Sequence, residues 1–176
     1  MGKRILKSTL LVLAFLLILL CGTTFALMFR QTEPLDNQFE AAAVSCAVAE
    51  SFDGSTKSSI AVTNTGNIDA YLRLRLVSYW VDSKGNILSK PSQMPTVSVA
   101  SGWITGSDNT YYYSQPVAPG SSTPNLLLTG IPLQQDSDGY LQGIEVFADA
   151  IQSKPEAAVS SSWGVSLSGG KITDAP

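Results

Sequence analysis

The chain contains no histidine among its 176 residues, and this absence excludes several kinds of chemistry at once. Without imidazole there is no Ser-His-Asp triad, no Cys-His pair and no histidine-ligated zinc centre. The sequence offers no catalytic residues, no metal site and no cofactor motif. We therefore expect a protein that is not an enzyme; an enzyme of unrecognised type would need a convergent polar pocket that the sequence does not reveal.

Charged residues are also scarce, since 11 Lys+Arg and 14 Asp+Glu make up only 14% of the chain and leave a net charge of -3. An average soluble domain has roughly 25% charged residues. With a pI near 4.8 the chain carries no basic field that would attract phosphate backbones. Nucleic acid is therefore not an expected partner.

Residues 1–26 have the layout of a secretory signal. Three basic residues come first, an unbroken apolar run follows from Leu10 to Leu20, and the small-residue stretch Gly22-Thr23-Thr24-Phe25-Ala26 closes the segment. We predict a signal peptide that is cleaved between Ala26 and Leu27. The membrane is then a partner only through this segment before cleavage.

Two alternatives to a cleaved signal stay open. A lipoprotein signal needs a small residue before Cys21, where this chain has Leu20. An uncleaved anchor from Leu10 to Phe29 reaches the about 20 apolar residues of a membrane span only if Gly22, Thr23 and Thr24 enter the bilayer.

Cleavage after residue 26 leaves Cys46 as the one cysteine of the mature chain, so no intramolecular disulfide is expected. Val44, Cys46 and Val48 alternate as the residues on one face of a strand do. Because cysteine behaves as a small hydrophobe when buried, we predict a core thiol. An intermolecular bridge is the alternative.

The chain from residue 40 to 168 shows the pattern of strands separated by turns. From Ala70 to Val81, Leu72, Leu74 and Leu76 alternate with polar and aromatic residues, which is the period of a half-buried strand. Further strands are expected at 41–50, 59–64, 87–88, 96–99, 110–114, 125–129 and 140–151, with a short helix at 155–159 and a flexible tail at 169–176.

This pattern of elements predicts an all-β fold. We expect a jelly-roll/Ig-like antiparallel β-sandwich with one short helix near the C-terminus, preceded by an N-terminal signal helix. Residues 27–39 form an N-terminal extension between the signal and the 40–168 domain.

Two sets of charged residues are interpreted as parts of the fold and not as sites. The stretch from Asp136 to Gly139 resembles part of a calcium loop but lacks the regular oxygen ligands and closing Glu of an EF-hand, so we predict a turn. Arg73 and Arg75 are expected to pair with Glu145 and Asp149 if their strands are neighbours. Such a cross-strand pair contributes about 0.2–1 kcal/mol.

An aromatic cluster consists of Trp103, Tyr111, Tyr112 and Tyr113, on both sides of a turn at 106–109. In a strand Tyr112 faces away from its two neighbours, so one face of the hairpin is expected to leave a ring exposed. The cluster is interpreted either as a packed hairpin with one exposed ring or as a candidate aromatic surface for sugar binding or assembly.

Several segments together resemble the camelysin/TasA-like exported proteins of Gram-positive bacteria, which depend on a dedicated signal peptidase. The resemblance covers Gly22 to about Trp163. The segments that carry it are Asn37-Gln38-Phe39, Cys46, Glu50-Ser51-Phe52-Asp53-Gly54 to Lys57, Val62-Thr63-Asn64-Thr65-Gly66-Asn67-Ile68-Asp69-Ala70-Tyr71-Leu72-Arg73, Gly102-Trp103-Ile104-Thr105-Gly106-Ser107-Asp108 leading into Tyr111–Tyr113, Pro116-Val117-Ala118-Pro119-Gly120, and the signal exit at 22–26.

This resemblance implies a secreted, non-enzymatic subunit of the biofilm matrix or of cell-surface fibres, assembled by donation of an N-terminal strand. Its partners would be other copies of itself, further matrix proteins, and the signal peptidase during export. The matching stretch here is Leu27 to Phe39, interrupted by Pro34, which cannot donate a ladder hydrogen bond. The residues that would anchor the donated strand are Leu27, Met28, Phe29, Leu35 and Phe39.

Camelysin itself carries a metalloprotease label, but this chain has neither His-Glu-x-x-His nor any histidine, so protease activity is not expected. The alternative function is a monomeric surface adhesion module that binds a carbohydrate or host ligand through the Trp103/Tyr111–Tyr113 hairpin. Deleting 27–39 separates the two hypotheses, since it abolishes polymers under the first and leaves ligand binding intact under the second.

Overall fold

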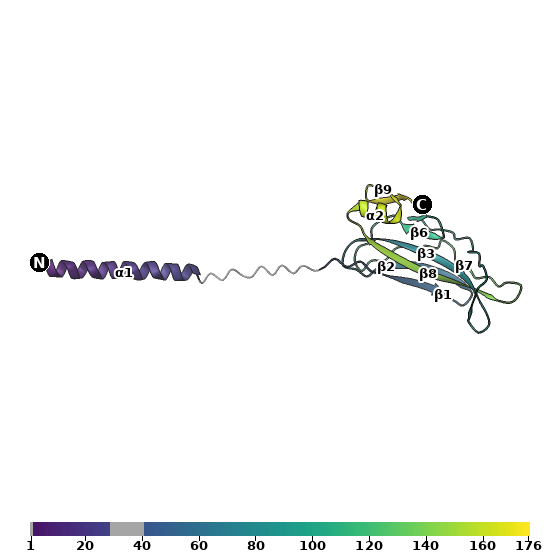
Figure 1. Ribbon diagram of the computed structural model, residues 1–176, viewed down its shortest axis with the longest axis horizontal. Coiled ribbons are helices and arrows are strands. Elements are labelled where there is room, and N and C mark those ends of the chain that lie inside the picture. Colours follow the sequence, from purple (N-terminus) through teal and green to yellow (C-terminus); the bar gives the residue numbers. More distant parts are fainter. Residues whose placement is uncertain (1, 29–40) are drawn as a thin grey trace. The chain divides into compact units, whose positions relative to one another are not determined.

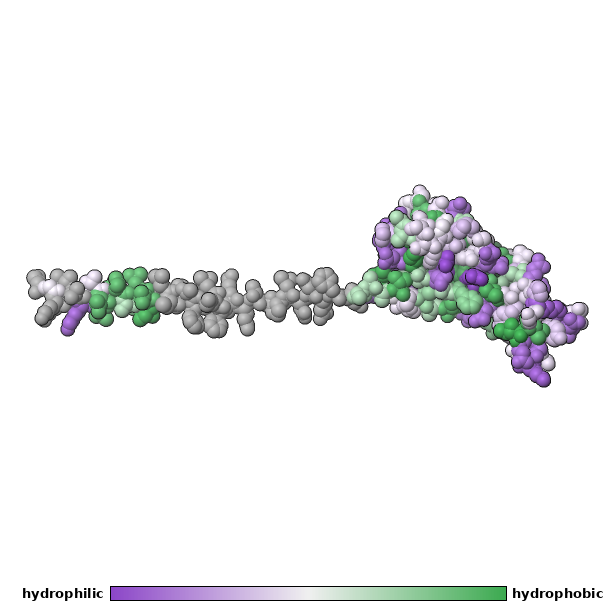
Figure 2. All heavy atoms as spheres, viewed as in Figure 1, coloured by the Kyte–Doolittle hydropathy of each residue, from purple (hydrophilic) through white to green (hydrophobic). Residues whose placement is uncertain are grey.

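The computed structural model describes residues 2–28 and 41–176, and within the first helix the side chains of residues 7–19. The chain divides into two units, Met1–Glu40 and Ala41–Pro176. The first unit contains α1 (Gly2–Met28), whose described apolar side chains are exposed (Figure 2). Among the described residues, no helix has the length and apolar character needed to cross a membrane.

The sheets of the second unit consist of antiparallel strands, which confirms the prediction of an all-β sandwich (Figure 1). In one sheet, β1 (Cys46–Phe52) pairs with β2 (Thr56–Asn64), and β2 also pairs with the short β7 (Ile131–Pro132). The two longer strands are joined by a tight turn in which the Asp53 side chain accepts hydrogen bonds from the N–H groups of Ser55 and Thr56.

The other sheet is built around β3 (Ala70–Val81), the strand that the sequence predicts with the same bounds. On one side, β8 (Leu141–Gln152) pairs with β3 along its whole length. On the other side β3 pairs with β6 (Thr110–Tyr113) and β4 (Ile87–Leu88), and β5 (Trp103–Thr105) adds to β6.

Alternation along β3 explains how the two sheets hold together. Leu72, Leu74 and Leu76 point inward, where they pack with Ile60 and Val62 of β2 in the main hydrophobic core. Complete burial of such a side chain contributes about 1.5–3 kcal/mol relative to leaving it in water. The inward direction predicted for the three leucines is therefore confirmed.

A second, smaller core lies on the outer face of the β3 sheet, where α2 (Glu156–Trp163) covers one end. Val159 and Trp163 of α2 pack there against Tyr71 and Tyr112. The predicted helix is thus present and somewhat longer than expected.

The chain then ends in a hairpin of β9 (Ser166–Ser168) and β10 (Lys171–Asp174). The flexible tail predicted for 169–176 is therefore wrong. Ile172 is only 2% exposed, because it packs into the second core, and its N–H donates to the carbonyl of Ser114 at 2.9 Å. The folded unit accordingly extends past residue 168 to Pro176.

The same end of the sheet holds the predicted cross-strand ion pair. Arg73 and Asp149 are register partners on β3 and β8, and Arg73 Nε donates to Asp149 Oδ2 at 3.0 Å. The guanidinium also lies 4.8 Å from the ring centre of Trp163. Arg75 does not form the other expected pair, because its register partner on β8 is Phe147.

Two predicted strands, at 96–99 and 125–129, are irregular and meet only through a bridge between Val99 and Leu127. Where the second segment passes β2, a side chain takes the place of one backbone acceptor. Asn125 Oδ1 accepts the N–H groups of Ile60 at 2.8 Å and Leu127 at 3.1 Å.

Asn64 ends β2 and is completely buried. Its Nδ2 donates to the carbonyls of Ile68 and Val117, both at 2.8 Å, and its Oδ1 accepts the N–H of Gly66 at 2.9 Å. One side chain thus ties the end of β2 to the turn that follows it and to a loop more than fifty residues away.

The same turn fixes where the chain enters β1. Asn67 Oδ1 accepts the N–H of Ala43 at 2.7 Å, and its Nδ2 donates to the carbonyl of Ala41 at 2.9 Å. Gly66 allows this close approach, because a Cβ there would lie 2.3 Å from the Ala43 carbonyl oxygen. The turn therefore holds the first residues of the folded unit in place.

Candidate assembly surface

The strands β1 and β8 each have an edge that no other described strand pairs with. Among the described residues, β1 pairs only with β2, and β8 pairs with β3 and otherwise only through one bridge from Leu141 to Gln135. The two strands belong to different sheets, yet their Cα atoms approach within 8 Å. We call the gap between β1 and β8 the seam.

The seam is closed near the start of β1. Cys46 and Val48 are partly buried and pack against the main core, as do Ala148 and Ala150 of β8. Burial raises the pKa of the Cys46 thiol, and the nearby Asp149 carboxylate raises it further. The predicted core thiol is therefore only partly buried, at the edge of the main core. Val44, which was predicted to lie on the same face of the strand, is exposed.

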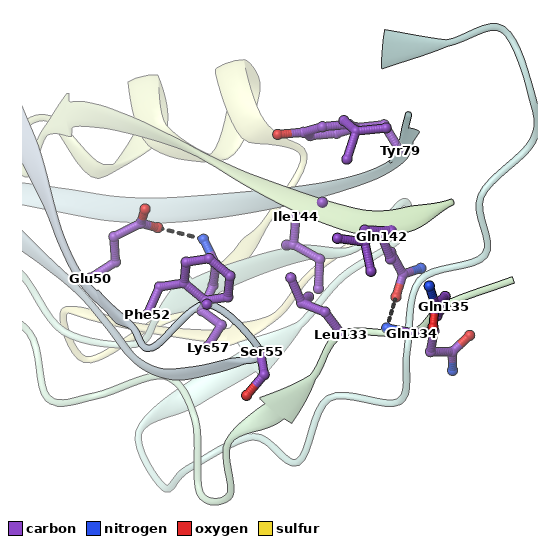
Figure 3. A pocket seen from close by; sticks show the side chains of 14 residues that line it. Glu50, Phe52, Ser55, Lys57, Tyr79, Leu133, Gln134, Gln135, Gln142 and Ile144 are labelled. Atoms are coloured by element: carbon purple, nitrogen blue, oxygen red, sulfur yellow. Dashed lines mark hydrogen bonds and ion pairs between the residues drawn. The ribbon is translucent and has the colours of Figure 1, made fainter. Parts of the chain in front are cut away.

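The opposite end of the seam is open. A cavity of about 600 Å³ lies there, lined by β1, β2, β8 and the segment after β7 (Figure 3). Phe52, Leu133, Leu141 and Ile144 provide its apolar surface. A second hollow of about 390 Å³ continues along β8 beside Val146.

An ion pair stands in this cavity. Lys57 Nζ lies 2.7 Å from Glu50 Oε2, and the side chains are 5% and 42% exposed, respectively. Among the described residues, Lys57 is the one charged residue that is buried. Its inward direction is associated with a β-bulge at Ser51/Phe52, which shifts the register between β1 and β2.

Close packing and hydrogen bonds hold the residues of β3 and β8 that surround the open end of the seam. The Tyr79 ring lies across Gly143 of β8, where a Cβ would stand 2.5 Å from ring atoms. Gln142 is buried, and its Nε2 donates to Ser92 Oγ at 3.0 Å and to the carbonyl of Gln93 at 2.8 Å. The cavity is therefore a built feature of the fold and not a gap between loose loops.

The aromatic hairpin does not form a surface. Trp103, Tyr111 and Tyr112 are buried and Tyr113 is partly buried. Tyr111 packs into the main core, whereas Tyr112, only 3% exposed, faces the other way and meets Trp163 of α2 at 5.7 Å between ring centres. The prediction of an exposed ring is wrong, because α2 covers the face on which Tyr112 lies.

The predicted N-terminal sites are outside the described side chains. Ala26, Leu27 and Met28 are the last residues of α1, for which only the backbone is described. Phe29, Leu35 and Phe39 lie outside the described residues altogether. Signal cleavage and the assembly strand therefore stay predictions.

The Asp136 stretch is a turn, as predicted. Asp136 Oδ1 accepts the N–H groups of Asp138 at 3.0 Å and Tyr140 at 2.9 Å. Lys90 pairs with both carboxylates and lowers the pKa of Asp136. In the described part of the chain, no three His, Cys, Asp or Glu residues gather in a way that would hold a metal ion.

Comparison with known proteins finds no match: no protein family, no curated protein and no solved structure resembles this chain closely enough to be identified with it.

The sequence analysis did not predict the seam. The seam depends on which strands remain unpaired once the sandwich has formed, and no pattern within one segment indicates this.

Proposed function

We propose that this chain is a secreted, non-enzymatic structural protein, a subunit of biofilm-matrix or cell-surface fibres of a Gram-positive bacterium. Subunits join when the N-terminal segment of one copy pairs with the sandwich of the next. The observation that carries this proposal is the open seam, where the edges of β1 and β8, unpaired in the described residues except at the Leu141–Gln135 bridge, flank a cavity with a partly apolar lining. The resemblance of the sequence to fibre proteins supports it.

The seam has the properties of an acceptor for a strand. Unpaired edges present free N–H and C=O groups that an added strand satisfies. Phe52 and Leu141, at the mouth of the cavity, are 49% and 53% exposed, which is more apolar surface than a solvated sheet edge needs. Burial of both by an added strand is favourable.

The donor in this proposal is the extension from Leu27 to Phe39, with five apolar anchors in an otherwise polar sequence. Cleavage between Ala26 and Leu27 releases it from the signal helix. Because donor and acceptor are different surfaces of one chain, the contact is heterologous and continues from copy to copy as an open fibre. The sandwich itself is proposed to have jelly-roll topology.

No observation now favours the alternative function, adhesion to a carbohydrate or host ligand. It required exposed rings in the Trp103/Tyr111–Tyr113 hairpin, and these rings are largely buried. We therefore propose assembly alone.

Replacing Phe52 and Leu141 by Ser in the chain that begins at Leu27 tests the acceptor. Loss of two half-exposed apolar side chains from the contact is expected to raise the concentration needed for polymers at least about tenfold. The reason is that burial of their exposed surface on docking contributes about 2 kcal/mol to the free energy of association. Light scattering across a concentration series measures this. Unfolding temperature should change little, because both side chains are already half exposed.

Leu128→Ser provides the matched control, since Leu128 is 71% exposed and its N–H donates to Ser98, away from the cavity. It should leave polymerisation unchanged. Equal effects of the control and the double variant would show that general surface hydrophobicity, and not the seam, drives association.

A further inference from the structure

The outer face of the sheet formed by β3 and β8 is only partly covered by the rest of the folded unit. We infer that an outer patch of Arg75, Val77, Glu145 and Phe147 binds the same patch of a second copy around a two-fold axis. Arg75 of each copy then lies opposite Glu145 of the other. In the proposed fibres this contact joins folded units of neighbouring fibres, a role that goes beyond strand donation and does not use the seam.

The register of the two strands places the four residues at the corners of a rectangle. Arg75 is paired with Phe147, and Val77 with Glu145, across β3 and β8. Register partners of an antiparallel pair lie on the same face of the sheet. Leu76, which lies between Arg75 and Val77, points into the main core. The four side chains therefore point away from that core.

No described element covers this part of the face. The helix α2 covers one end of the sheet, where it packs on Tyr71 and Tyr112 (Figure 1). Phe147 belongs to neither hydrophobic core and is 51% exposed, and Arg75 and Glu145 are exposed as well. An aromatic ring that is half exposed in a sheet face leaves apolar surface for a partner to bury.

The two charged residues of the outer patch are free to pair with a second molecule. Among the described residues, neither Arg75 nor Glu145 forms an ion pair. They lie diagonally across the two strands, about 7–8 Å apart between Cα atoms. Arg75 lines a small hollow with Asp108 and Asp149, but Asp149 already pairs with Arg73 at 3.0 Å. The patch thus presents one unpaired charge of each sign.

Such a patch is complementary to itself. A two-fold axis that lies between two facing sheets, perpendicular to the line from Arg75 to Glu145, places each charge opposite the other sign on the second copy, twice in one contact. Phe147 and Val77 occupy the other two corners, so they lie near the axis and meet their own counterparts. The strands of the two copies cross steeply, as in orthogonally packed sheets. A partner of uniform charge would meet like charge at one corner.

A single contact of this kind is weak. Four residues cannot supply the about 800 Å² that each partner buries in a stable complex, so free copies stay apart. Copies held together in large numbers bind far more tightly, because each further contact forms at a high local concentration. The contact therefore acts between fibres or other arrays and not between free chains.

Phosphatidylcholine vesicles that carry many copies of the chain beginning at Ala41 test this inference without fibres. This chain has its own cores and all the strands, and it is attached through an added N-terminal tag. Vesicles with the native chain should cluster, which turbidity measures. Arg75→Glu and Glu145→Arg should each abolish clustering, since each places like charges opposite one another, and the double variant should restore it.

Lys84→Glu is the matched control, because it reverses an exposed charge in the loop between β3 and β4, away from the outer patch. It should leave clustering unchanged. The unfolding temperature of all these variants should change little, since the substituted side chains are exposed.

Mixing the two single variants separates the patch from general charge effects. Vesicles with Arg75→Glu should cluster with vesicles with Glu145→Arg, although neither clusters with itself, since opposite charges then meet at both corners. General repulsion predicts a different result. The folded unit has 7 Lys+Arg and 11 Asp+Glu, so the less acidic Glu145→Arg vesicles would cluster more than the native ones if repulsion alone decided.

The outcomes keep this contact apart from strand donation. Native vesicles that do not cluster, single variants that cluster like the native chain, or a double variant that does not restore clustering would overturn the inference and leave the seam untouched. Clustering that follows the charge pattern supports the outer patch even if the chain beginning at Leu27 forms no fibres, a result that would overturn strand donation alone.

Discussion

A chain that begins at Leu27 is expected to form fibres, whereas a chain that begins at Ala41 is expected to stay monomeric at every concentration. Both contain the whole folded unit from Ala41 to Pro176 and differ only by the extension. Without a donor, the seam of each copy stays empty, and heterologous growth has no first step.

Size-exclusion chromatography with light scattering, followed by negative-stain microscopy, measures this difference. The loss should be complete, which makes it the largest effect that the proposed assembly predicts. Fibres from both chains would place the contact within the folded unit. Monomers from both would remove homopolymerisation from the proposal.

Asn64→Ala is expected to lower the free energy of unfolding by about 3 kcal/mol, through the loss of three hydrogen bonds, of which one is buried and two are partly buried. The substitution leaves the carbonyls of Ile68 and Val117 and the N–H of Gly66 without the partner they have in the native fold. Because Asn64 is completely buried, water does not easily replace that partner. Urea unfolding followed by tryptophan fluorescence measures the change.

Asn67→Ala is the matched control in the same turn. Asn67 also makes side-chain hydrogen bonds to the backbone, with Ala43 and Ala41, but these are exposed to water. Its loss should cost less than about 1 kcal/mol, since exposed groups exchange one hydrogen bond for another with solvent. Equal losses for the two variants would contradict the importance assigned to burial at Asn64.

Period-two patterns were sufficient to predict the long strands. Leu72, Leu74 and Leu76 alternate without interruption, so β3 and the direction of its leucines follow from the sequence alone. Arg73 and Asp149 were also predicted as partners, because opposite charges on adjacent strands lie at pairing distance.

The failures have non-local causes. Tyr112 alternates correctly within β6, but α2 arrives from later in the chain and buries the outer face. Ile172 is buried because β9, α2 and Ser114 meet around it, although the last eight residues taken alone resemble a frayed end. Pattern within a segment does not indicate what will cover that segment.

The seam was missed for a related reason. Lys57 occupies an inward position next to a β-bulge, and a lysine in a strand pattern normally indicates the solvent face. The open edges of β1 and β8 are a property of the completed sheets, since they exist only where no third strand pairs. No short stretch of sequence contains that information.

The most direct test of head-to-tail donation mixes two chains that each lack one half of the contact. The donor chain begins at Leu27 and carries Phe52→Ser and Leu141→Ser, and the acceptor chain begins at Ala41 with a native seam. Light scattering measures the mass of each chain alone and of the mixture, at a concentration below the one at which the donor chain polymerises by itself. We predict two monomers that combine into a one-to-one complex and grow no further; a mixture that remains monomeric would contradict strand donation into the seam.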